Sequence, residues 1–86
     1  MKIEWDENKR AQTLNERGLD FANVAFLEWG KALTLQDTRK NYGEPRYITY
    51  GRIKDRLCVV AWTERNGVMR IFSLRKANAR EVKRHG

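Results

Sequence analysis

The sequence predicts one α+β domain over residues 1–86, with two N-terminal helices packed on an antiparallel sheet of about four to five strands and a short basic helix at the end. Three observations lead to this fold class. Helix caps divide the first 30 residues, β-rich segments alternate with turns after residue 44, and a further capping pattern comes near residue 80. Nine aromatic residues and one proline among 86 residues favour a folded chain over a disordered one.

The N-terminal segment predicts a strand and then a helix. Lys2–Trp5 is a short strand candidate, and Asp6 is a suitable N-cap for a helix over Glu7–Arg17. Gly18 stands where a helix-ending glycine is expected. The helix contains few apolar residues, so we expect it to be mostly exposed.

A second helix is predicted over Phe21–Glu28, with Asp20 as its cap. At a spacing of 3.6 residues, one side of this helix carries Phe21, Val24, Ala25 and Glu28. Ala32–Leu35 is a short strand candidate, and Asp37–Pro45 is a polar loop that holds the only proline.

The second half predicts an antiparallel meander. Arg46–Ile53 is rich in β-forming residues, and Lys54-Asp55 is a tight turn. Leu57–Thr63 is apolar on both faces, which is typical of a strand in the middle of a sheet. Asn66-Gly67 favours a type I′ turn, so we expect a hairpin with Val68–Leu74.

A capping pattern predicts the terminal helix over Ala79–His85, because Asn78 and Glu81 have the spacing of an N-cap and its third helical residue. We expect Val82 to dock this helix on the sheet and His85 to lie in an exposed, frayed tail. The basic residues expected to stay in water are Arg80, Lys83 and Arg84.

The net charge of +7 is distributed unevenly. Residues 1–43 hold seven basic and seven acidic residues, whereas residues 44–86 hold eleven basic and four acidic ones. Such an excess indicates nucleic acid, an anionic membrane or an acidic protein as the partner, or else a solvated basic face. We expect nucleic acid, and RNA in particular.

Several function classes have no support in the sequence. It contains neither a GxGxxG fingerprint nor a P-loop, and one Cys and one His are too few for a zinc site; we expect no cofactor and no metal. No apolar run is long enough to cross a bilayer, and the first residues hold no signal-peptide core. Cys58 cannot form an internal disulfide and is expected to be a buried, inert thiol. We therefore expect a cytoplasmic protein with no membrane partner.

The remaining side chains suffice to cleave RNA without a metal. The ribose 2′-OH attacks the adjacent phosphate, so the protein needs a base near that hydroxyl, cations around the phosphate and an acid for the leaving 5′-oxygen. Arginine suits the phosphate because its guanidinium is always charged and can bind two oxygens.

Three clusters are candidates for such a site. Glu44 and Arg46 are two residues apart on an extended backbone, so they point to one face, either as an ion pair or as a base beside a phosphate clamp. Arg70 lies on a strand between Val68 and Phe72 and faces the same way as both, so it either snorkels at an edge or lines a groove. Arg75 and Lys76 lie where the last strand meets the last helix, a junction that favours anion binding. Generic attraction for RNA is expected from Arg80, Lys83 and Arg84.

Several short motifs follow one another along the chain. They are Trp5-Asp6, Asn15, Gly18-Leu19, Leu27-Glu28-Trp29, Asp37-Thr38-Arg39, Tyr42-Gly43-Glu44-Pro45-Arg46, Asp55-Arg56-Leu57, Arg70-Ile71-Phe72-Ser73-Leu74-Arg75-Lys76-Ala77-Asn78 and Arg80-Glu81-Val82-Lys83-Arg84. In this order and spacing the chain resembles the BrnT-type toxins of bacterial toxin–antitoxin pairs over nearly its whole length. Two positions depart from many relatives: Arg17, where His is common, and His85, where Tyr is common.

The resemblance implies a RelE-like fold and a ribonuclease that arrests translation. It also implies a cognate antitoxin with a ribbon-helix-helix domain, whose complex with the toxin binds operator DNA. The positions that it marks as functional are Glu44, Arg46, Arg70, Arg75 and Lys76. We expect the three arginines to neutralise the scissile phosphate, Glu44 to act as the base, and Lys76 to act as an acid or a phosphate contact.

Two other interpretations remain open from the sequence. In the first, the basic surface binds RNA or DNA without chemistry, and Glu44 only orients Arg46. In the second, the chain is a structural partner whose basic half docks an acidic or apolar antitoxin segment.

Overall fold

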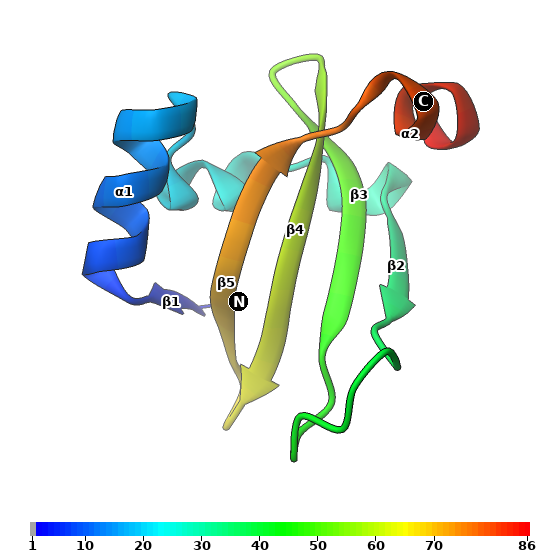
Figure 1. The fold of residues 1–86 in the computed structure, drawn as a ribbon. Coiled ribbons are helices and arrows are strands. Elements are labelled where there is room, and N and C mark those ends of the chain that lie inside the picture. Colours follow the sequence, from blue (N-terminus) through cyan, green and yellow to red (C-terminus); the bar gives the residue numbers. More distant parts are fainter. Residues whose placement is uncertain (1) are drawn as a thin grey trace.

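The computed structural model describes residues 2–86 and contains five strands, two α-helices and two short 3-10 helices within them. In chain order these are β1 (Lys2–Trp5), α1 (Glu7–Arg17), η1 (Phe21–Phe26), η2 (Trp29–Lys31), β2 (Leu33–Gln36), β3 (Tyr47–Ile53), β4 (Arg56–Arg65), β5 (Val68–Lys76) and α2 (Ala79–His85). The strands form one sheet in the order β1-β5-β4-β3-β2 (Figure 1). The predicted α+β class and strand number are therefore confirmed.

The prediction of a fully antiparallel sheet is wrong at one edge. The other strands pair antiparallel with their neighbours, but β1 pairs with β5 in parallel. Turn residues predict pairing only between strands that follow one another closely, whereas β1 and β5 lie at opposite ends of the chain. Local sequence signals therefore could not specify this contact.

The two tight turns follow the predicted chemistry. Lys54, Asp55, Asn66 and Gly67 all have positive φ, at 51, 64, 54 and 77°, as type I′ turns require. They fold β3, β4 and β5 into a meander with β4 in the middle. The apolar pattern on both faces of β4 predicted this central position.

A β-bulge in β5 changes which side chains share a face. Ala61 pairs with Ser73 and Trp62 pairs with Ile71, so Phe72 is the extra residue. Burial confirms the shift, because the buried residues Met69 and Ile71 are followed by Leu74 and not by residue 73. As a result, Arg70 and Arg75 lie on the same face, although an odd spacing in a regular strand would separate them.

The second N-terminal helix is a 3-10 helix and not the predicted α-helix. A 3-10 helix has three residues per turn, so its core contacts fall at Phe21, Val24 and Leu27. Ala25 and Glu28, which the 3.6 spacing assigned to the same side, are exposed. The end of η1 packs closely on β3, because a Cβ at Gly51 would collide with the Leu27 side chain.

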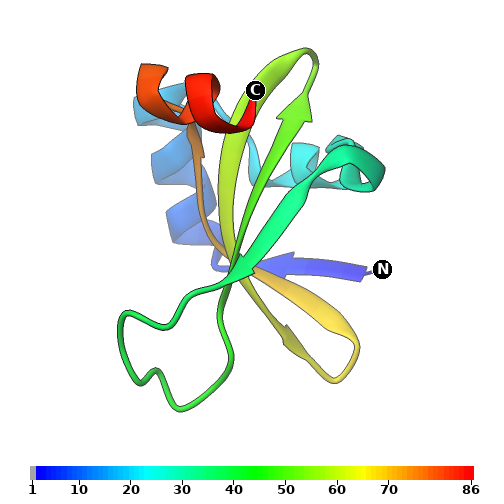
Figure 2. The ribbon, with the colours of Figure 1, turned by 90° about the vertical axis from the view of Figure 1, so that its right-hand side faces the viewer.

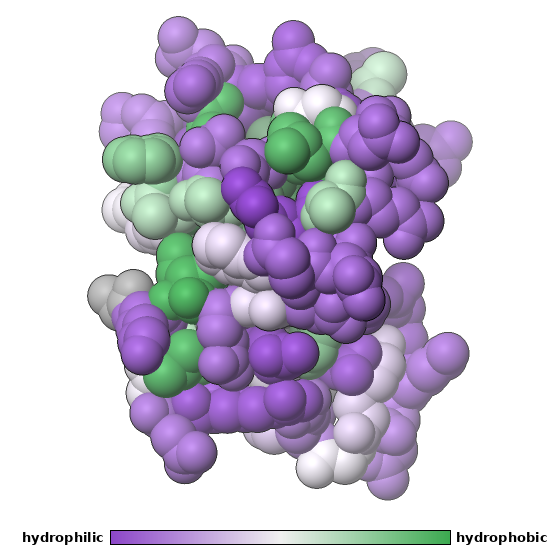
Figure 3. Space-filling model, turned by 90° about the vertical axis from the view of Figure 1, so that its left-hand side faces the viewer, coloured by the Kyte–Doolittle hydropathy of each residue, from purple (hydrophilic) through white to green (hydrophobic). Residues whose placement is uncertain are grey.

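Helix α1 begins and ends as predicted. The Asp6 side chain accepts a hydrogen bond from the Asn8 N–H, and Gly18 ends the helix in the left-handed conformation. None of its residues is buried, and the view from this side shows a mostly hydrophilic surface with small apolar patches (Figure 3). No helix within residues 2–86 is long and apolar enough to cross a membrane.

Helix α2 has the predicted capping box, but its docking differs from the prediction. Asn78 accepts from the Glu81 N–H and the Glu81 carboxylate accepts from the Asn78 N–H. Val82 is 45% exposed and does not anchor the helix. Instead, the half-buried His85 ring packs on Tyr50, with centroids 4.3 Å apart, so the predicted frayed tail is wrong.

The two faces of the sheet are covered differently. The 3-10 helices lie behind the sheet, where the main core gathers, whereas α1 and α2 stand at the rims of the other face (Figures 1 and 2). We call this second face of β3, β4 and β5 the open face.

Candidate nucleic-acid interface

The open face carries arginines from β5 and from the residue before β3. Arg46 immediately precedes β3, and Arg70 and Arg75 belong to β5. If the register of β3 and β4 is continued by one residue, Arg46 lies across β4 from Arg70, with Thr63 between them. The loop before β3 borders the lower end of this face (Figure 2).

Arg46 is held by aromatic rings. Its guanidinium carbon lies 4.3 Å from the Tyr42 ring centroid and 4.1 Å from that of Phe72. Within residues 2–86, its Nε is the one buried side-chain nitrogen or oxygen without a hydrogen-bond partner. Cation–π contacts thus fix the plane of the guanidinium. Because Nε is buried, an anion would have to approach the terminal nitrogens of this side chain, which is 33% exposed.

Glu44 is paired mainly with Arg65. Arg65 donates to both carboxylate oxygens, at 3.0 and 2.9 Å, whereas the nearest Arg46 nitrogen is 3.8 Å away. The hydrogen bonds from Arg65 hold the pKa of Glu44 below its usual value. The predicted proximity of Glu44 and Arg46 is present, but Arg65 is the stronger partner.

Arg70 completes this group at the β1 side. Its guanidinium lies 3.5 Å from the Glu4 carboxylate of β1. We define the hairpin cluster, named for its place near the β4–β5 turn, as Glu4, Tyr42, Glu44, Arg46, Arg65, Arg70 and Phe72. Three guanidinium groups share two carboxylates there, so the hairpin cluster carries an excess of positive charge.

A second group lies at the other end of the open face. Arg75 donates to both oxygens of Glu81, at 2.7 and 2.8 Å. These hydrogen bonds lower the pKa of Glu81 to about 2. The stacked Tyr50 and His85 rings lie beside this pair, and we call the four residues the α2 cluster.

The two clusters are separated along the strands. Arg46 and Tyr50 are four residues apart at the β3 side, which corresponds to about 13 Å at roughly 3.3 Å per residue. The two clusters are therefore spaced to contact different phosphates of one strand.

The structure does not bring Lys76 together with the arginines. Arg75 and Lys76 are successive residues of β5 and point to opposite faces. Lys76 lines a hollow behind the sheet together with Arg56 and Cys58. Arg80, Lys83 and Arg84 are exposed on α2, at the upper rim of the open face.

Four side chains of the open face escaped the sequence interpretation. Arg65 and Phe72 join the hairpin cluster, and Tyr50 and His85 join the α2 cluster. The even spacing of Tyr50 from Arg46 would have placed it on this face. The even spacing of Phe72 from Arg70 likewise predicted that these two residues share a face. His85 had no such signal, because the docking of α2 positions it.

Cys58 is buried, and burial raises its pKa, as expected for an inert thiol. Within residues 2–86, no three His, Cys, Asp or Glu side chains come together as a metal site.

A family model described as the ribonuclease toxin, BrnT, of type II toxin-antitoxin systems matches residues 5–81. A search of curated proteins gives no significant match.

Proposed function

The chain belongs to the BrnT family of ribonuclease toxins of type II toxin–antitoxin systems, and we propose that its open face cleaves RNA without a metal ion. Family membership implies an RNA substrate and an antitoxin partner. The observation that carries the proposal is the aromatic clamp on Arg46, which leaves the side chain partly exposed and 3.8 Å from the nearest carboxylate, that of Glu44. A preorganised cation with free donors is what a developing phosphorane requires.

The proposed reaction is a transphosphorylation. The 2′-oxygen of the ribose forms a bond to the adjacent phosphorus, and the bond from phosphorus to the 5′-oxygen of the next nucleotide breaks. One proton passes from the 2′-OH to Glu44, and solvent water supplies one proton to the departing 5′-oxygen. Arg46 and Arg70 neutralise the scissile phosphate, and Arg75 contacts another phosphate of the same strand.

Glu44 is the proposed base, because it is the carboxylate nearest to Arg46. Its lowered pKa keeps it ionised but makes it a weak base. Proton transfer therefore requires that Arg65 release one carboxylate oxygen when RNA binds. Lys76, on the other side of the sheet, serves as a phosphate contact and not as the acid, while Arg80, Lys83 and Arg84 add general attraction.

The wider biology proposed for the chain follows from its family. The chain acts as one RelE-like toxin domain in the cytoplasm, where RNA cleavage arrests translation. A ribbon-helix-helix antitoxin neutralises it, and operator DNA is bound only through the toxin–antitoxin complex. Co-expression with the adjacent reading frame, followed by a pull-down and an operator-binding assay, tests these partners.

The central experiment uses the purified protein without its antitoxin. We expect it to cleave RNA in excess EDTA and to leave fragments that end in a 2′,3′-cyclic phosphate. Circular dichroism confirms that the protein is folded under the same conditions. Intact RNA with folded protein would contradict the catalytic proposal.

One observation favours a second candidate function, RNA binding without chemistry. Both Glu44 oxygens accept hydrogen bonds from Arg65, an arrangement that also suits a purely orienting carboxylate. Comparing Glu44→Gln with Arg75→Ala separates the two functions. A binding module loses affinity in Arg75→Ala and little in Glu44→Gln, whereas an enzyme loses turnover in Glu44→Gln while its affinity for RNA stays nearly unchanged.

A further inference from the structure

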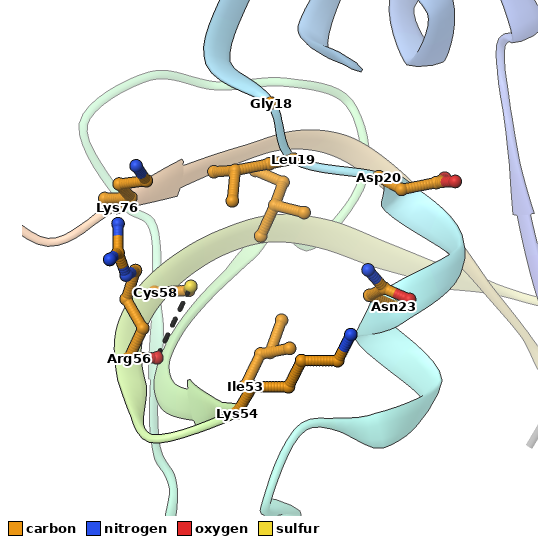
Figure 4. Close-up of a pocket in the computed structure, with 10 residues that line it drawn as sticks. Gly18, Leu19, Asp20, Asn23, Ile53, Lys54, Arg56, Cys58 and Lys76 are labelled. Carbon is orange, nitrogen blue, oxygen red and sulfur yellow. Dashed lines mark hydrogen bonds between the residues drawn. The ribbon is translucent and has the colours of Figure 1, made fainter.

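Behind the sheet, a hollow of about 350 Å³ opens between the end of α1, η1, the β3–β4 turn and the end of β5 (Figure 4). Three basic side chains line it: Lys54, Arg56 and Lys76. Lys76 and Arg56 lie at one side of the hollow, and Lys54 extends toward Asn23 at the other (Figure 4). The hollow is on the other side of the sheet from both clusters of the open face.

The positive charge in this hollow is not balanced by the protein. Asp20 is the one carboxylate among the lining residues, and Arg10 occupies both its oxygens at 2.9 Å. Asp20 points away from the three basic groups (Figure 4). Within residues 2–86, none of those basic groups forms an ion pair with a carboxylate of the chain. An anion would therefore meet cations that need not first release an internal partner.

The floor of the hollow is apolar. It is formed by Leu19, Ile53, Cys58 and Leu74. The Asn23 amide, which can both donate and accept hydrogen bonds, stands at the rim. A cationic rim over an apolar floor suits a ligand that joins a phosphate to a flat ring, and the volume falls within the roughly 300–1,000 Å³ of small-molecule sites.

We propose that this hollow binds one nucleotide of an RNA strand, with its phosphate on Lys54, Arg56 and Lys76 and its base against the apolar floor. The proposal rests on the proposed function only in taking RNA as the ligand. Arg75 and Lys76 are adjacent, so a strand that leaves the α2 cluster can cross the end of β5 and reach the hollow. The RNA-binding surface thus continues around the upper end of the sheet.

The test is an NMR titration of ¹⁵N-labelled protein with two probes, free AMP and a short oligoribonucleotide whose 2′-hydroxyls are all methylated. Methylation removes the nucleophile, so binding is measured without cleavage. We expect the oligonucleotide to shift the amide signals of Gly18, Asn23 and Lys54 as well as those of the open face. AMP should shift only the first group, at higher concentration.

Matched variants sharpen this test. Arg56→Gln with Lys76→Gln should weaken oligonucleotide binding several-fold and reduce the salt dependence, by about 0.7 in log–log slope for each lost contact. Lys2→Gln with Lys31→Gln removes the same charge from other parts of the surface and should change both quantities much less. Equal losses in the two double variants would show general attraction and overturn the proposal.

The titration has further decisive outcomes. Shifts with AMP but none with the oligonucleotide would overturn the assignment to an RNA strand. Shifts of the same amides by an acidic peptide, with none from either nucleotide probe, would assign the hollow to a protein partner. Because the methylated RNA is not a substrate, a loss of catalysis leaves these results unchanged, and the wild-type titration decides the proposal even if a variant fails to fold.

Discussion

The two clusters of the open face hold their arginines in different ways. In the hairpin cluster, Arg46 lies between two aromatic rings and has an unpartnered Nε. In the α2 cluster, Arg75 donates two short hydrogen bonds to Glu81 and a longer one to the Lys76 carbonyl. An incoming phosphate can bind the terminal nitrogens of the partly exposed Arg46, whereas it must compete with a carboxylate for Arg75.

This difference indicates that the two ends of the open face have different roles. Aromatic rings orient a guanidinium without neutralising it, so its charge remains available to a transition state. A bidentate carboxylate orients a guanidinium equally well but cancels its charge. We therefore expect the hairpin cluster to dominate catalysis and the α2 cluster to contribute to positioning and stability.

Arg46→Ala should cause the largest loss. Removing a preorganised cation from the phosphate is expected to lower kcat on the order of 10²-fold or more. Arg46→Lys should rescue little, because an ammonium does not reproduce the planar stacking of the guanidinium. Single-turnover cleavage of a labelled RNA measures both effects.

Arg52→Ala is the matched control, since Arg52 belongs to β3 and lies on the same face. It donates to the Asp55 carbonyl and not to either cluster. A loss of kcat in Arg52→Ala equal to that in Arg46→Ala would show that the aromatic clamp does not make Arg46 more important for catalysis than another arginine of this face.

Glu44→Gln should cause the next largest loss, about 10²-fold in kcat, which is the low end for a general base because the lowered pKa makes Glu44 a weak one. Because the Glu44 pKa is lowered, the carboxylate stays ionised as the pH falls from 7 through its usual value of 4.5. Wild-type kcat/KM should therefore show no acidic decline from Glu44 until the pH is below about 4.5. A decline centred near pH 6 that persists in Glu44→Gln would assign the proton transfer to another group.

Several parts of the fold and site could be predicted because their causes are local. The cap at Gly18, the turn at Asn66-Gly67 and the Asn78–Glu81 capping box each depend on a few adjacent residues. Glu44 and Arg46 lie close together because extended backbone repeats every two residues.

The parts that sequence reasoning missed depend on distant contacts. The bulge at Phe72 puts Arg70 and Arg75 on one face, and no local sequence pattern predicts this bulge. Lys76 is a separate case, because the sequence placed it with Arg75 at a strand-to-helix junction after a strand expected to end at Leu74. Strand β5 continues to Lys76, so strand alternation points the two side chains to opposite faces. The packing of His85 on Tyr50 requires α2 to fold back beside β3.

A smaller effect is expected at the α2 cluster. Arg75→Ala should weaken RNA binding by about 10-fold and His85→Gln should lower kcat less than that, because neither contacts the scissile phosphate in our assignment. An imidazole can exchange a proton near neutral pH. A His85→Gln loss of 10²-fold or more, with a changed pH profile, would move the catalytic centre to the α2 cluster and reverse the comparison.

The smallest expected effect concerns stability and pH. The Glu81 pKa of about 2 lies below its usual 4.5, so ionised Glu81 stabilises the fold above about pH 4.5, and this contribution is lost as the pH falls toward 2. Glu81→Gln retains an oxygen for the Asn78 N–H but loses the charge. Because Arg75 is 42% exposed, solvent screens the pair, and we expect the variant to lower Tm by only a few degrees at pH 7.

The difference in Tm between Glu81→Gln and wild type should vanish near pH 2, whereas the exposed control Glu64→Gln should show little difference at either pH. A Tm difference that stays constant with pH would mean that the charge of Glu81 does not stabilise the fold, which would contradict the stabilising ion pair with Arg75.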